Sequence, residues 1–366
     1  MTELTAGQTR LKPSLSKRSL GSSALVKGHH IQSKQHISDR HSLFKPPHLH
    51  NTHAFEKRQV PFKPPFVYRS LASSTVGKPF NVSLDIVQSL HLIPETFTIL
   101  TSANVDDVVF VTAASSDHFI ESMNLISSVQ TFKPGHVIIY YDLGLQPTQA
   151  NEVRSWCSVE LRKFGNPAYP KHVTEELKTY AFKLLIIQEI LREFPGMFWM
   201  DASVRLKGSD LSAAYAKAVE TNGFVIINNG SNTIYTETYP GLYDYMPSDI
   251  ERLKKTWVRA SGFMLIYNTF ETFNNYLLWM YLCVLDRKCA APHTTINCVY
   301  DKKNKATTWA KCHRYDQSVV NVLAANRWNF DNKAYYVRRV PFTVMRLKWM
   351  WFSDAPTRCS QTSRRK

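Results

Sequence analysis

The sequence lacks the long apolar run that a membrane-spanning helix requires. Its best candidate, YLLWMYLCVL at 276–285, is far shorter than the roughly 18–20 residues that cross a bilayer. We therefore expect a core helix there, and membrane association only if an anchor is missing from this chain. The chain also does not open with a charged segment followed by an apolar one, so no secretory signal peptide is predicted.

Acidic residues are scarce: 29 Asp and Glu stand against 45 Lys and Arg, and the net charge is +16. Residues 1–80 hold thirteen of these bases and three of the acids, which is +10 of the excess. This segment is rich in His, Lys, Ser and Pro and has almost no apolar periodicity, which predicts a disordered, basic, His-rich arm over 1–95. A solvated tail is the default interpretation, and a polyanion-binding tail or an organelle transit sequence is the alternative.

No C-x-x-C pair occurs, which weakens the case for zinc. The six cysteines are an even number, and four of them lie within 283–312. Disulfides of a lumenal protein are favoured over a zinc site built from Cys289, His293, Cys298 or Cys312, and free thiols stand level with disulfides.

The sequence shows no internal repeat, and from about residue 106 it alternates between strand and helix patterns. Continuous β-branched and aromatic runs occupy 106–115, 136–145, 223–230 and 257–269, with helical patterns between several of them. All-apolar strands of this kind are typical of a mostly parallel sheet that is covered on both faces. We predict one α/β domain over 100–352, followed by a frayed basic tail at 353–366.

The clearest helix is TEELKTYAFKLLIIQEILREFPG, which we expect to begin at Thr174 and to stop at Pro195-Gly196. The stretch MFWMDASVRL (197–206) follows at once: an apolar strand that runs into an acid, two small residues and an arginine, so Asp201 lies at or just past the carboxyl end of that strand. In open α/β sheets, ligands bind at that edge. An isolated acid at a strand end more often caps a turn.

Two further stretches carry residues of functional type. Lys183 lies on the helix before Asp201, where a cation can neutralise phosphate, although alone it is an ordinary helix lysine. Asp316 and Gln317 begin the helical stretch of HRYDQSVVN, where they can bond to sugar hydroxyls or supply a base. Capping of that helix explains them equally well.

Together, these stretches resemble GT-A-type glycosyltransferases, especially retaining enzymes of the family 8 sort, over about 106–326. The resemblance rests on VVFVTAASS, YAFKLLIIQEILREFPGMFWMDAS, ASGFMLIYN and RYDQSVVN. Uncharacterised animal glycosyltransferase-like proteins share the Asp-x-Ser form of the Asp-x-Asp motif more closely. The resemblance implies a GT-A-like, Rossmann-type sheet with helices on both faces.

The same resemblance implies roles for ten residues of this chain. Thr112, Ala113 and Ala114 would line the nucleotide, and Lys183 would meet the diphosphate. Asp201 and Ser203 would occupy the two acid positions, and Gly262, Asp316 and Gln317 would face the sugar or the acceptor. The catalytic set would be Asp201, Asp316 and Gln317, and His313 would be a further metal ligand.

Two departures from the family pattern concern the metal. Ser203 replaces the second acid, and the family's late His-x-x-Gly-x-x-Lys motif is absent after residue 326. A divalent metal, Mn²⁺ or Mg²⁺, is implied by the resemblance, with Asp201 as its ligand and His313 or His293 as a substitute for the late histidine.

The favoured hypothesis is a glycosyltransferase that moves a sugar from a nucleotide-diphosphate donor to a hydroxyl of a glycan, protein or lipid acceptor. The alternative is a sugar-nucleotide or glycan-binding protein that keeps the fold without catalysis. A third hypothesis, nucleic-acid binding through the arm, rests on charge alone, and no specific nucleic acid is expected. The family resemblance favours the Golgi or secretory lumen; the chain is cytoplasmic if it is complete as given.

Overall fold

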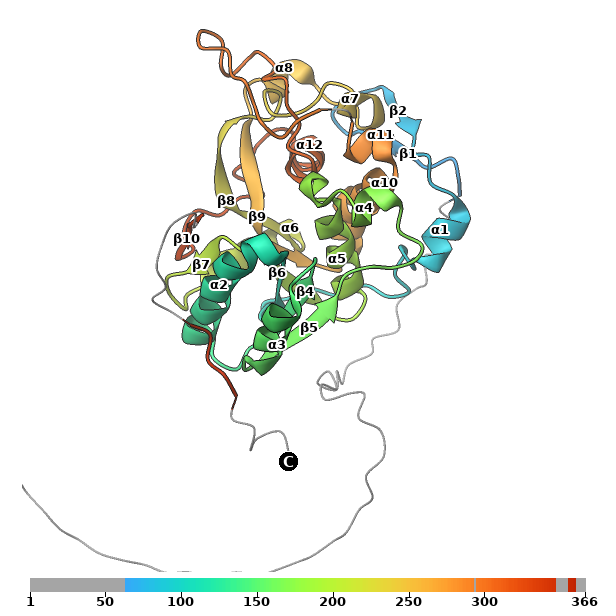
Figure 1. The fold of residues 1–366 in the computed structure, drawn as a ribbon. Coiled ribbons are helices and arrows are strands. Elements are labelled where there is room, and N and C mark those ends of the chain that lie inside the picture. Colours follow the sequence, from blue (N-terminus) through green and yellow to red (C-terminus); the bar gives the residue numbers. More distant parts are fainter. Residues whose placement is uncertain (1–62, 293, 347–354, 360–366) are drawn as a thin grey trace, which may run out of the picture. The chain divides into compact units, whose positions relative to one another are not determined.

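A six-stranded sheet in the order β5-β4-β3-β6-β9-β8 forms the centre of the protein (Figure 1). The structure is a computed structural model that describes residues 63–292, 294–346 and 355–359. Strands β3 to β6 pair in parallel, whereas β9 is antiparallel to both β6 and β8, so five strands point the same way. The predicted mostly parallel α/β sheet is therefore confirmed. The strands are β3 (Val109–Ala114), β4 (Ile138–Asp142), β5 (Val159–Lys163), β6 (Gly196–Met200), β8 (Phe224–Thr233) and β9 (Trp257–Tyr267).

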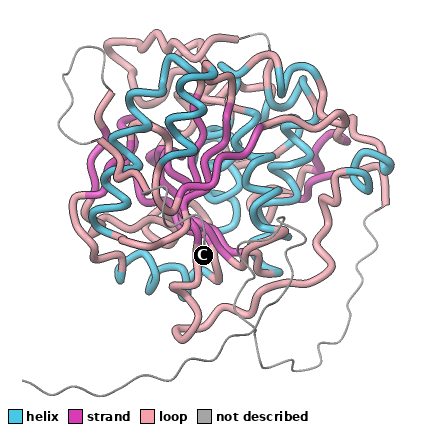
Figure 2. The backbone as a smooth tube through the Cα atoms, turned by 60° about the horizontal axis from the view of Figure 1, so that its bottom comes forward, coloured by secondary structure: helices cyan, strands magenta, loops and turns pink. Residues whose placement is uncertain are grey.

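Helices cover both faces of this sheet, as Figure 2 shows. Successive side chains of a strand point to opposite faces, so β3 sends Val109 and Val111 into one apolar cluster and Phe110 into another. The first cluster includes side chains of α1 (Leu84–Ser89), α5 (Ala181–Leu191), α10 (Leu278–Leu285) and α12 (Asp316–Arg327), and the second includes α2 (Phe119–Phe132), α3 (Pro147–Ser155) and α6 (Ser212–Thr221).

Shorter elements connect and flank these layers. They are β1 (Val67–Arg69), β2 (Val76–Pro79), α4 (Lys171–Thr174), β7 (Val204–Leu206), α7 (Leu242–Tyr245), α8 (Ile250–Leu253), α9 (Phe270–Thr272), α11 (Arg287–Ala290) and β10 (Phe342–Val344).

The predicted arm over 1–95 differs from the structure in its last third. Residues 63–95 form β1, β2 and α1, and Phe66, Tyr68 and Phe80 are buried in the same cluster as α5 and α10. In residues 63–80, Pro, Ser and Gly interrupt the apolar residues, so this part lacks a long apolar run, whereas Val82, Val87, Leu90 and Leu92 after it are buried in the same cluster. Residues 1–62 of the predicted arm lie outside the described residues.

The expected helix from Thr174 is wrong at its start. Thr174 ends the short α4, and α5 begins only at Ala181, after Tyr180 adopts a left-handed backbone with φ of 55°. Burial of α5 is nearly complete. Every residue of α5 except Glu189 is buried, because the helix packs on β6 as well as on α10 and α12.

The stretch 197–206 contains the end of one strand, a turn and a second strand. Strand β6 ends at Met200, and β7 begins at Val204 and pairs antiparallel with β10 instead of continuing the central sheet. The amide of Val204 donates to the carbonyl of Asp201, which closes the turn. Asp201 therefore lies directly after the carboxyl end of β6, as predicted.

All six cysteines are paired, which excludes the alternative zinc site and the free thiols. The disulfides are Cys157–Cys359, Cys283–Cys289 and Cys298–Cys312. His293, the remaining member of the alternative zinc set, lies outside the described residues.

The predicted frayed tail at 353–366 differs from the structure at residues 355–359. The disulfide to Cys157 and backbone bonds from Cys157 to Thr357 and from Cys359 to Ser155 fasten this segment beside α3.

No helix of the described segments is long and apolar enough to cross a membrane. The run at 276–285 forms α10, which is almost wholly buried within the first apolar cluster. The predicted core helix is confirmed.

Candidate functional site

Three of the predicted residues meet at the carboxyl edge of the sheet. Lys183 lies in the first turn of α5, and a short connection at 192–195 reverses the chain into β6, so the start of α5 lies beside the end of β6. The Nζ atom of Lys183 is 3.0 Å from Oδ1 of Asp201 and 2.7 Å from Oδ2 of Asp316. We call these three residues the Lys183 cluster.

Neighbouring side chains hold the two carboxylates of the cluster in place. The indole Nε1 of Trp199 donates to Oδ1 of Asp201 at 2.8 Å. The hydroxyl of Ser261 donates to Oδ2 of Asp316 at 2.6 Å. Each carboxylate therefore accepts a hydrogen bond from the sheet in addition to its contact with the ammonium group of Lys183.

Burial within the cluster is uneven. The side chains of Lys183 and Asp316 are 2% and 5% exposed, whereas that of Asp201 is 36% exposed. Burial by itself lowers the pKa of Lys183, but the charges of Asp201 and Asp316 outweigh it and raise the pKa above the ordinary value. The lysine is thus a permanent cation between two acids, the cluster carries a formal charge of −1, and Asp201 is its solvent-facing member.

Gly262 lies against Asp201, and its predicted role of facing the sugar or the acceptor stays a prediction. The amide of Asp201 donates to the carbonyl of Gly262 at 2.8 Å, which continues the β6–β9 ladder past Met200. A Cβ atom at position 262 would lie 2.8 Å from Oδ2 of Asp201. The absence of a side chain at this position is therefore what gives the carboxylate its room.

The two helices that deliver Lys183 and Asp316 both follow a tyrosine with positive φ. Tyr180 precedes α5 with φ of 55°, and Tyr315 precedes α12 with φ of 44°. Such backbone costs on the order of 1–3 kcal/mol at a non-glycine residue and is typical of functional sites. Asp316 is also the first residue of α12, where the helix dipole stabilises negative charge.

The three residues predicted to line a nucleotide lie within β3. The side chains of Thr112, Ala113 and Ala114 are all buried, and Thr112 Oγ1 has no hydrogen-bond partner among the described residues. Ser115 and Ser116, which directly follow β3 at the carboxyl edge of the sheet, are partly exposed. The nucleotide-lining role of 112–114 stays a prediction.

The remaining predicted residues lie outside the Lys183 cluster. Gln317 is buried and donates to Oε2 of Glu237 at 3.1 Å. Ser203 is also buried, and its carbonyl accepts bonds from Arg205 Nη1 at 2.9 Å and from the amide of Met345 at 2.8 Å.

His313 is fully buried, and its Nδ1 accepts from the amide of Tyr239 at 3.2 Å. Burial lowers the pKa of His313 to about 3, so the ring is neutral at physiological pH. Its other nitrogen, Nε2, has no partner among the described residues.

A divalent metal would find few protein ligands at this site. Within the described ranges, no group of three or more His, Cys, Asp and Glu residues is arranged to hold a metal ion. Oδ1 of Asp201 is bonded to Trp199 and Lys183, whereas no described residue donates to Oδ2. The protein thus offers an ion one carboxylate oxygen, which suits Mg²⁺ only where substrate phosphates complete its coordination.

The sequence interpretation missed Trp199, Ser261 and Glu237. Trp199 precedes Asp201 by two residues, so strand periodicity places both on one face. Ser261 is adjacent to Gly262 in the ASG step. No sequence signal distinguishes Glu237.

Comparisons with known proteins give the following matches. The profile of a family described as "Protein of unknown function (DUF1647)" matches residues 63–188, from the start of the described chain into α5. No curated protein matches. Among solved structures, the chain is similar to the galactosyltransferase LgtC in complex with donor and acceptor sugar analogues, with a TM-score of 0.37 and 12% identity over 65% of this chain and 86% of that one.

It is similar as well to an active-site mutant of LgtC, with a TM-score of 0.40 and 12% identity over 65% of this chain and 86% of that one. The apo structure of the bifunctional glycosyltransferase WbbM gives a TM-score of 0.34 and 16% identity over 57% of this chain and 38% of that one.

Proposed function

We propose that the protein is a glycosyltransferase that moves a sugar from a nucleotide-diphosphate donor to an acceptor hydroxyl. The observation that carries the proposal is the Lys183 cluster, which places a half-exposed carboxylate, Asp201, at the carboxyl edge of a mostly parallel sheet. Ligands of open α/β sheets bind at that edge. Two of the four sequence stretches that resemble GT-A-type enzymes contain all three members of this cluster: Lys183 and Asp201 lie in YAFKLLIIQEILREFPGMFWMDAS, and Asp316 lies in RYDQSVVN.

In the proposed reaction, the bond between the anomeric carbon and the diphosphate oxygen breaks, and its electron pair leaves with the diphosphate. The acceptor oxygen forms the new bond to that carbon, and its proton passes to a carboxylate or to water. Asp201 is the member of the cluster that reaches the donor. Lys183 is too buried for that contact, so its role is to hold Asp201 and Asp316 in position.

A divalent ion would be held by Oδ2 of Asp201 together with the donor phosphates, and it would offset the charge that develops on the leaving diphosphate. The residues of the described chain fit an ion that arrives with the donor. Their single available carboxylate oxygen is a poor site for an ion on its own.

A binding and turnover screen of the purified protein tests the proposal. Nucleotide sugars are offered with Mn²⁺ or Mg²⁺, and both heat of binding and release of nucleoside diphosphate are measured. We expect at least one donor to bind, and Asp201→Asn to reduce turnover on the order of a hundredfold. Asp85→Asn, at an exposed position of α1, is the matched control and should retain turnover. Binding of no donor at all would refute the proposal.

The buried Ser203, at the position of the second acid, favours one alternative: a sugar-nucleotide-binding protein without catalysis. Tight donor binding with no turnover in the presence of Mn²⁺, and with Asp201→Asn weakening only that binding, would select this alternative.

We also propose that the protein works in the lumen of the secretory pathway, because three disulfides account for all its cysteines and such bonds persist in oxidising compartments. Asn81, in the sequon Asn81-Val82-Ser83, is exposed and should then carry a glycan. Enzymatic deglycosylation of the secreted protein should change its electrophoretic mobility. The variant Asn81→Gln should lack the part of this mobility change that comes from a glycan on Asn81. Six titratable thiols in the natively isolated, denatured protein would contradict this location.

A further inference from the structure

A second buried acid lies close to the start of α12 and is not part of the Lys183 cluster. Glu237 follows β8, and its side chain accepts three hydrogen bonds from uncharged groups. Asn232 Nδ2 and the hydroxyl of Tyr300 donate to Oε1 at 2.7 and 2.8 Å, and Gln317 Nε2 donates to Oε2 at 3.1 Å. Burial and the nearby Glu237 carboxylate raise the pKa of Tyr300 to about 12, so its hydroxyl keeps the proton that it donates.

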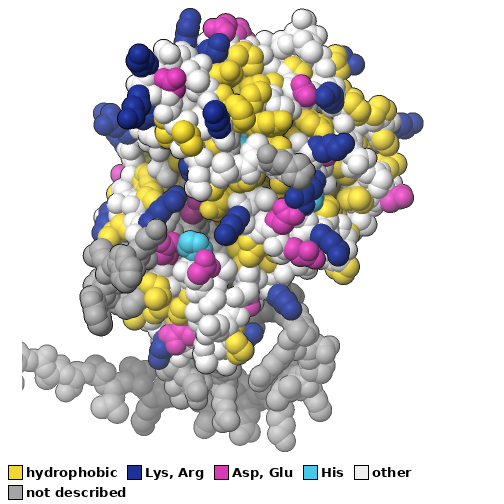
Figure 3. All heavy atoms as spheres, turned by 45° about the horizontal axis from the view of Figure 1, so that its top comes forward, with side chains coloured by type: hydrophobic (Ala, Val, Ile, Leu, Met, Phe, Trp, Pro, Cys, Tyr) yellow, Lys and Arg dark blue, Asp and Glu magenta, His cyan; other side chains and the backbone are white. Residues whose placement is uncertain are grey.

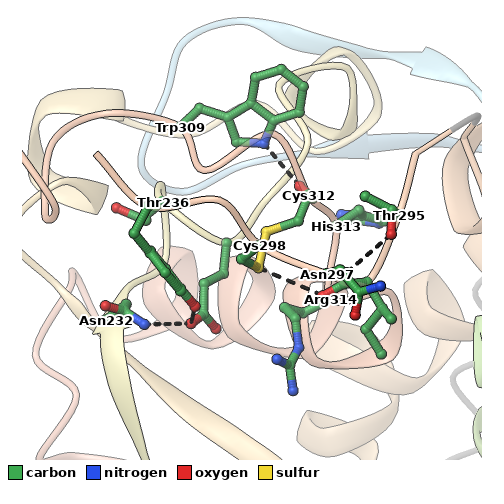
Figure 4. Close-up of a disulfide and its surroundings, with 12 residues drawn as sticks. Asn232, Thr236, Thr295, Asn297, Cys298, Trp309, Cys312, His313 and Arg314 are labelled. Atoms are coloured by element: carbon green, nitrogen blue, oxygen red, sulfur yellow. Dashed lines mark hydrogen bonds between the residues drawn. A yellow bond between two sulfur atoms is a disulfide. The ribbon is translucent and has the colours of Figure 1, made fainter. Parts of the chain in front are cut away.

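The backbone of Glu237 is bonded to the same helix start. Its carbonyl accepts from the amide of Arg314 at 3.1 Å and from the hydroxyl of Ser318 at 3.0 Å. The Cys298–Cys312 disulfide closes the adjacent loop, and Figure 4 shows Asn232 and Arg314 beside it. Glu237 therefore has little freedom to move relative to the first turn of α12.

These contacts determine the orientation of the Gln317 side-chain amide, that is, which of its oxygen and nitrogen atoms faces Glu237. A carboxylate accepts hydrogen bonds and donates none, so the NH₂ group of Gln317 must face Glu237. The amide oxygen is thereby left on the other side, where no described residue donates to it. Without an acceptor at Glu237, the two orientations of the amide would be nearly equivalent in shape.

We infer that Glu237 is a positioning residue that orients the Gln317 amide, so that its carbonyl oxygen and not its NH₂ group is presented on the side away from Glu237. This inference rests on the proposed function. The presented oxygen accepts a hydrogen bond from a hydroxyl of the bound sugar or acceptor, and Asp316, one residue earlier on α12, is already held by Lys183 and Ser261.

The decisive variant is Glu237→Gln, because it changes only the group that faces Gln317 from a hydrogen-bond acceptor to a hydrogen-bond donor. The new amide oxygen still accepts from Asn232 and Tyr300, while its NH₂ group now faces Gln317. Gln317 then has to turn its amide over to accept that bond and presents NH₂ instead of oxygen. We expect the Tm to stay within a few degrees of wild type while kcat/KM falls on the order of tenfold, the value of one hydrogen bond.

Exchanging the two residues, with Glu237→Gln and Gln317→Glu in one protein, gives a reversed pair that should restore the stability and the activity lost in the single variants. Gln317→Glu alone places two carboxylates face to face at a contact that is 3.1 Å in the wild type, and should lower the Tm by several degrees. Combining Glu237→Gln with Gln317→Glu restores a donor–acceptor pair and again presents an oxygen. We expect the double variant to recover the Tm lost by Gln317→Glu and the kcat/KM lost by Glu237→Gln.

Glu251→Gln, on the exposed surface of α8, is the control for the loss of one glutamate charge. Full kcat/KM in Glu237→Gln would overturn the inference. Parallel losses of Tm and kcat/KM that the reversed pair does not recover would overturn it as well, because that result marks a residue needed only for packing. If the wild type transfers no sugar, the proposed function fails separately, and recovery of Tm in the reversed pair alone decides whether this contact orients Gln317.

Discussion

Replacing Lys183 with Met tests whether the Lys183 cluster is held together electrostatically. Methionine keeps much of the length of the lysine chain but removes the ammonium group from between the two carboxylates. Asp316, with a side chain 5% exposed, then keeps Ser261 as its one side-chain partner within the described part of the chain. A buried charge left in this way destabilises the folded state strongly.

The magnitude follows from the two contacts of 2.7 and 3.0 Å. At an effective dielectric constant of about 20, each is worth about 6 kcal/mol of gross attraction. The cost of removing the charges from water offsets much of this, and breaking a buried pair typically costs 3–5 kcal/mol in net terms. We expect Lys183→Met to lose about that much of the free energy of unfolding, measured by urea denaturation at pH 7.

A double variant separates charge from packing. Asp316→Asn, added to Lys183→Met, removes the uncompensated charge, so the double variant should be more stable than Lys183→Met alone. Lys78→Met is the control: Lys78 is an exposed lysine in a surface ion pair and should change stability by no more than about 0.5 kcal/mol. A loss below about 1 kcal/mol in Lys183→Met, or a loss that Asp316→Asn does not reduce, would refute the reasoning.

Gly262→Ala should displace Asp201, because the added Cβ would lie 2.8 Å from Oδ2 of Asp201. Calorimetry should then show weaker binding of the donor. An unchanged donor affinity would show that the Asp201 carboxylate can accommodate the added methyl group. Burial lowers the pKa of His313 to about 3, below the ordinary value of about 6.5 in the unfolded chain. The unfolded state therefore binds the extra proton between these values, and stability falls as the pH falls through that window, by up to about 5 kcal/mol over its whole width. His313→Asn, which keeps an acceptor for Tyr239, should flatten this dependence in denaturant titrations from pH 7 to 4; an unaltered slope would contradict the assignment.

The sheet is the part of the fold that the sequence predicts best. Its strands are buried on both faces and contain continuous runs of apolar residues, so the parallel β3 and β4 and the antiparallel β9 stand out without knowledge of their neighbours. The position of Asp201 follows from the end of such a run. Asp316 is different: only the family resemblance brings it to the same site, because no local pattern links residues so far apart.

Two errors have physical causes that local patterns do not contain. The sequence before α5 has helical composition throughout, yet the left-handed backbone at Tyr180 breaks the helix there. Residues 63–95 reach the core through aromatic residues such as Phe66 and Phe80 and through aliphatic residues such as Val87, and Phe80 packs against Trp279 of α10. In both cases tertiary packing overrides local propensity.

The distribution of charge on the surface bears on the hypothesis that the protein binds a polyanion. Figure 3 shows Lys and Arg side chains interspersed with Asp and Glu on the face that it presents. A mixed surface of this kind gives a polyanion less to bind than a continuous basic stripe would. Polyanion binding through residues 1–62 therefore stays a prediction about a segment outside the described residues.

Strand register is what joins the separately predicted residues into one site. Met200 of β6 pairs with Phe263 of β9, so the next step along the ladder brings Asp201 to Gly262, and Ser261 lies one residue further along β9 toward Asp316. A shift of one residue would bring Phe263 or Ser261 to Asp201 in place of the glycine, and it would turn Trp199 to the opposite face. The small residues of the ASG step therefore work only in this pairing, which explains why the DAS and ASG stretches are informative together and weak alone.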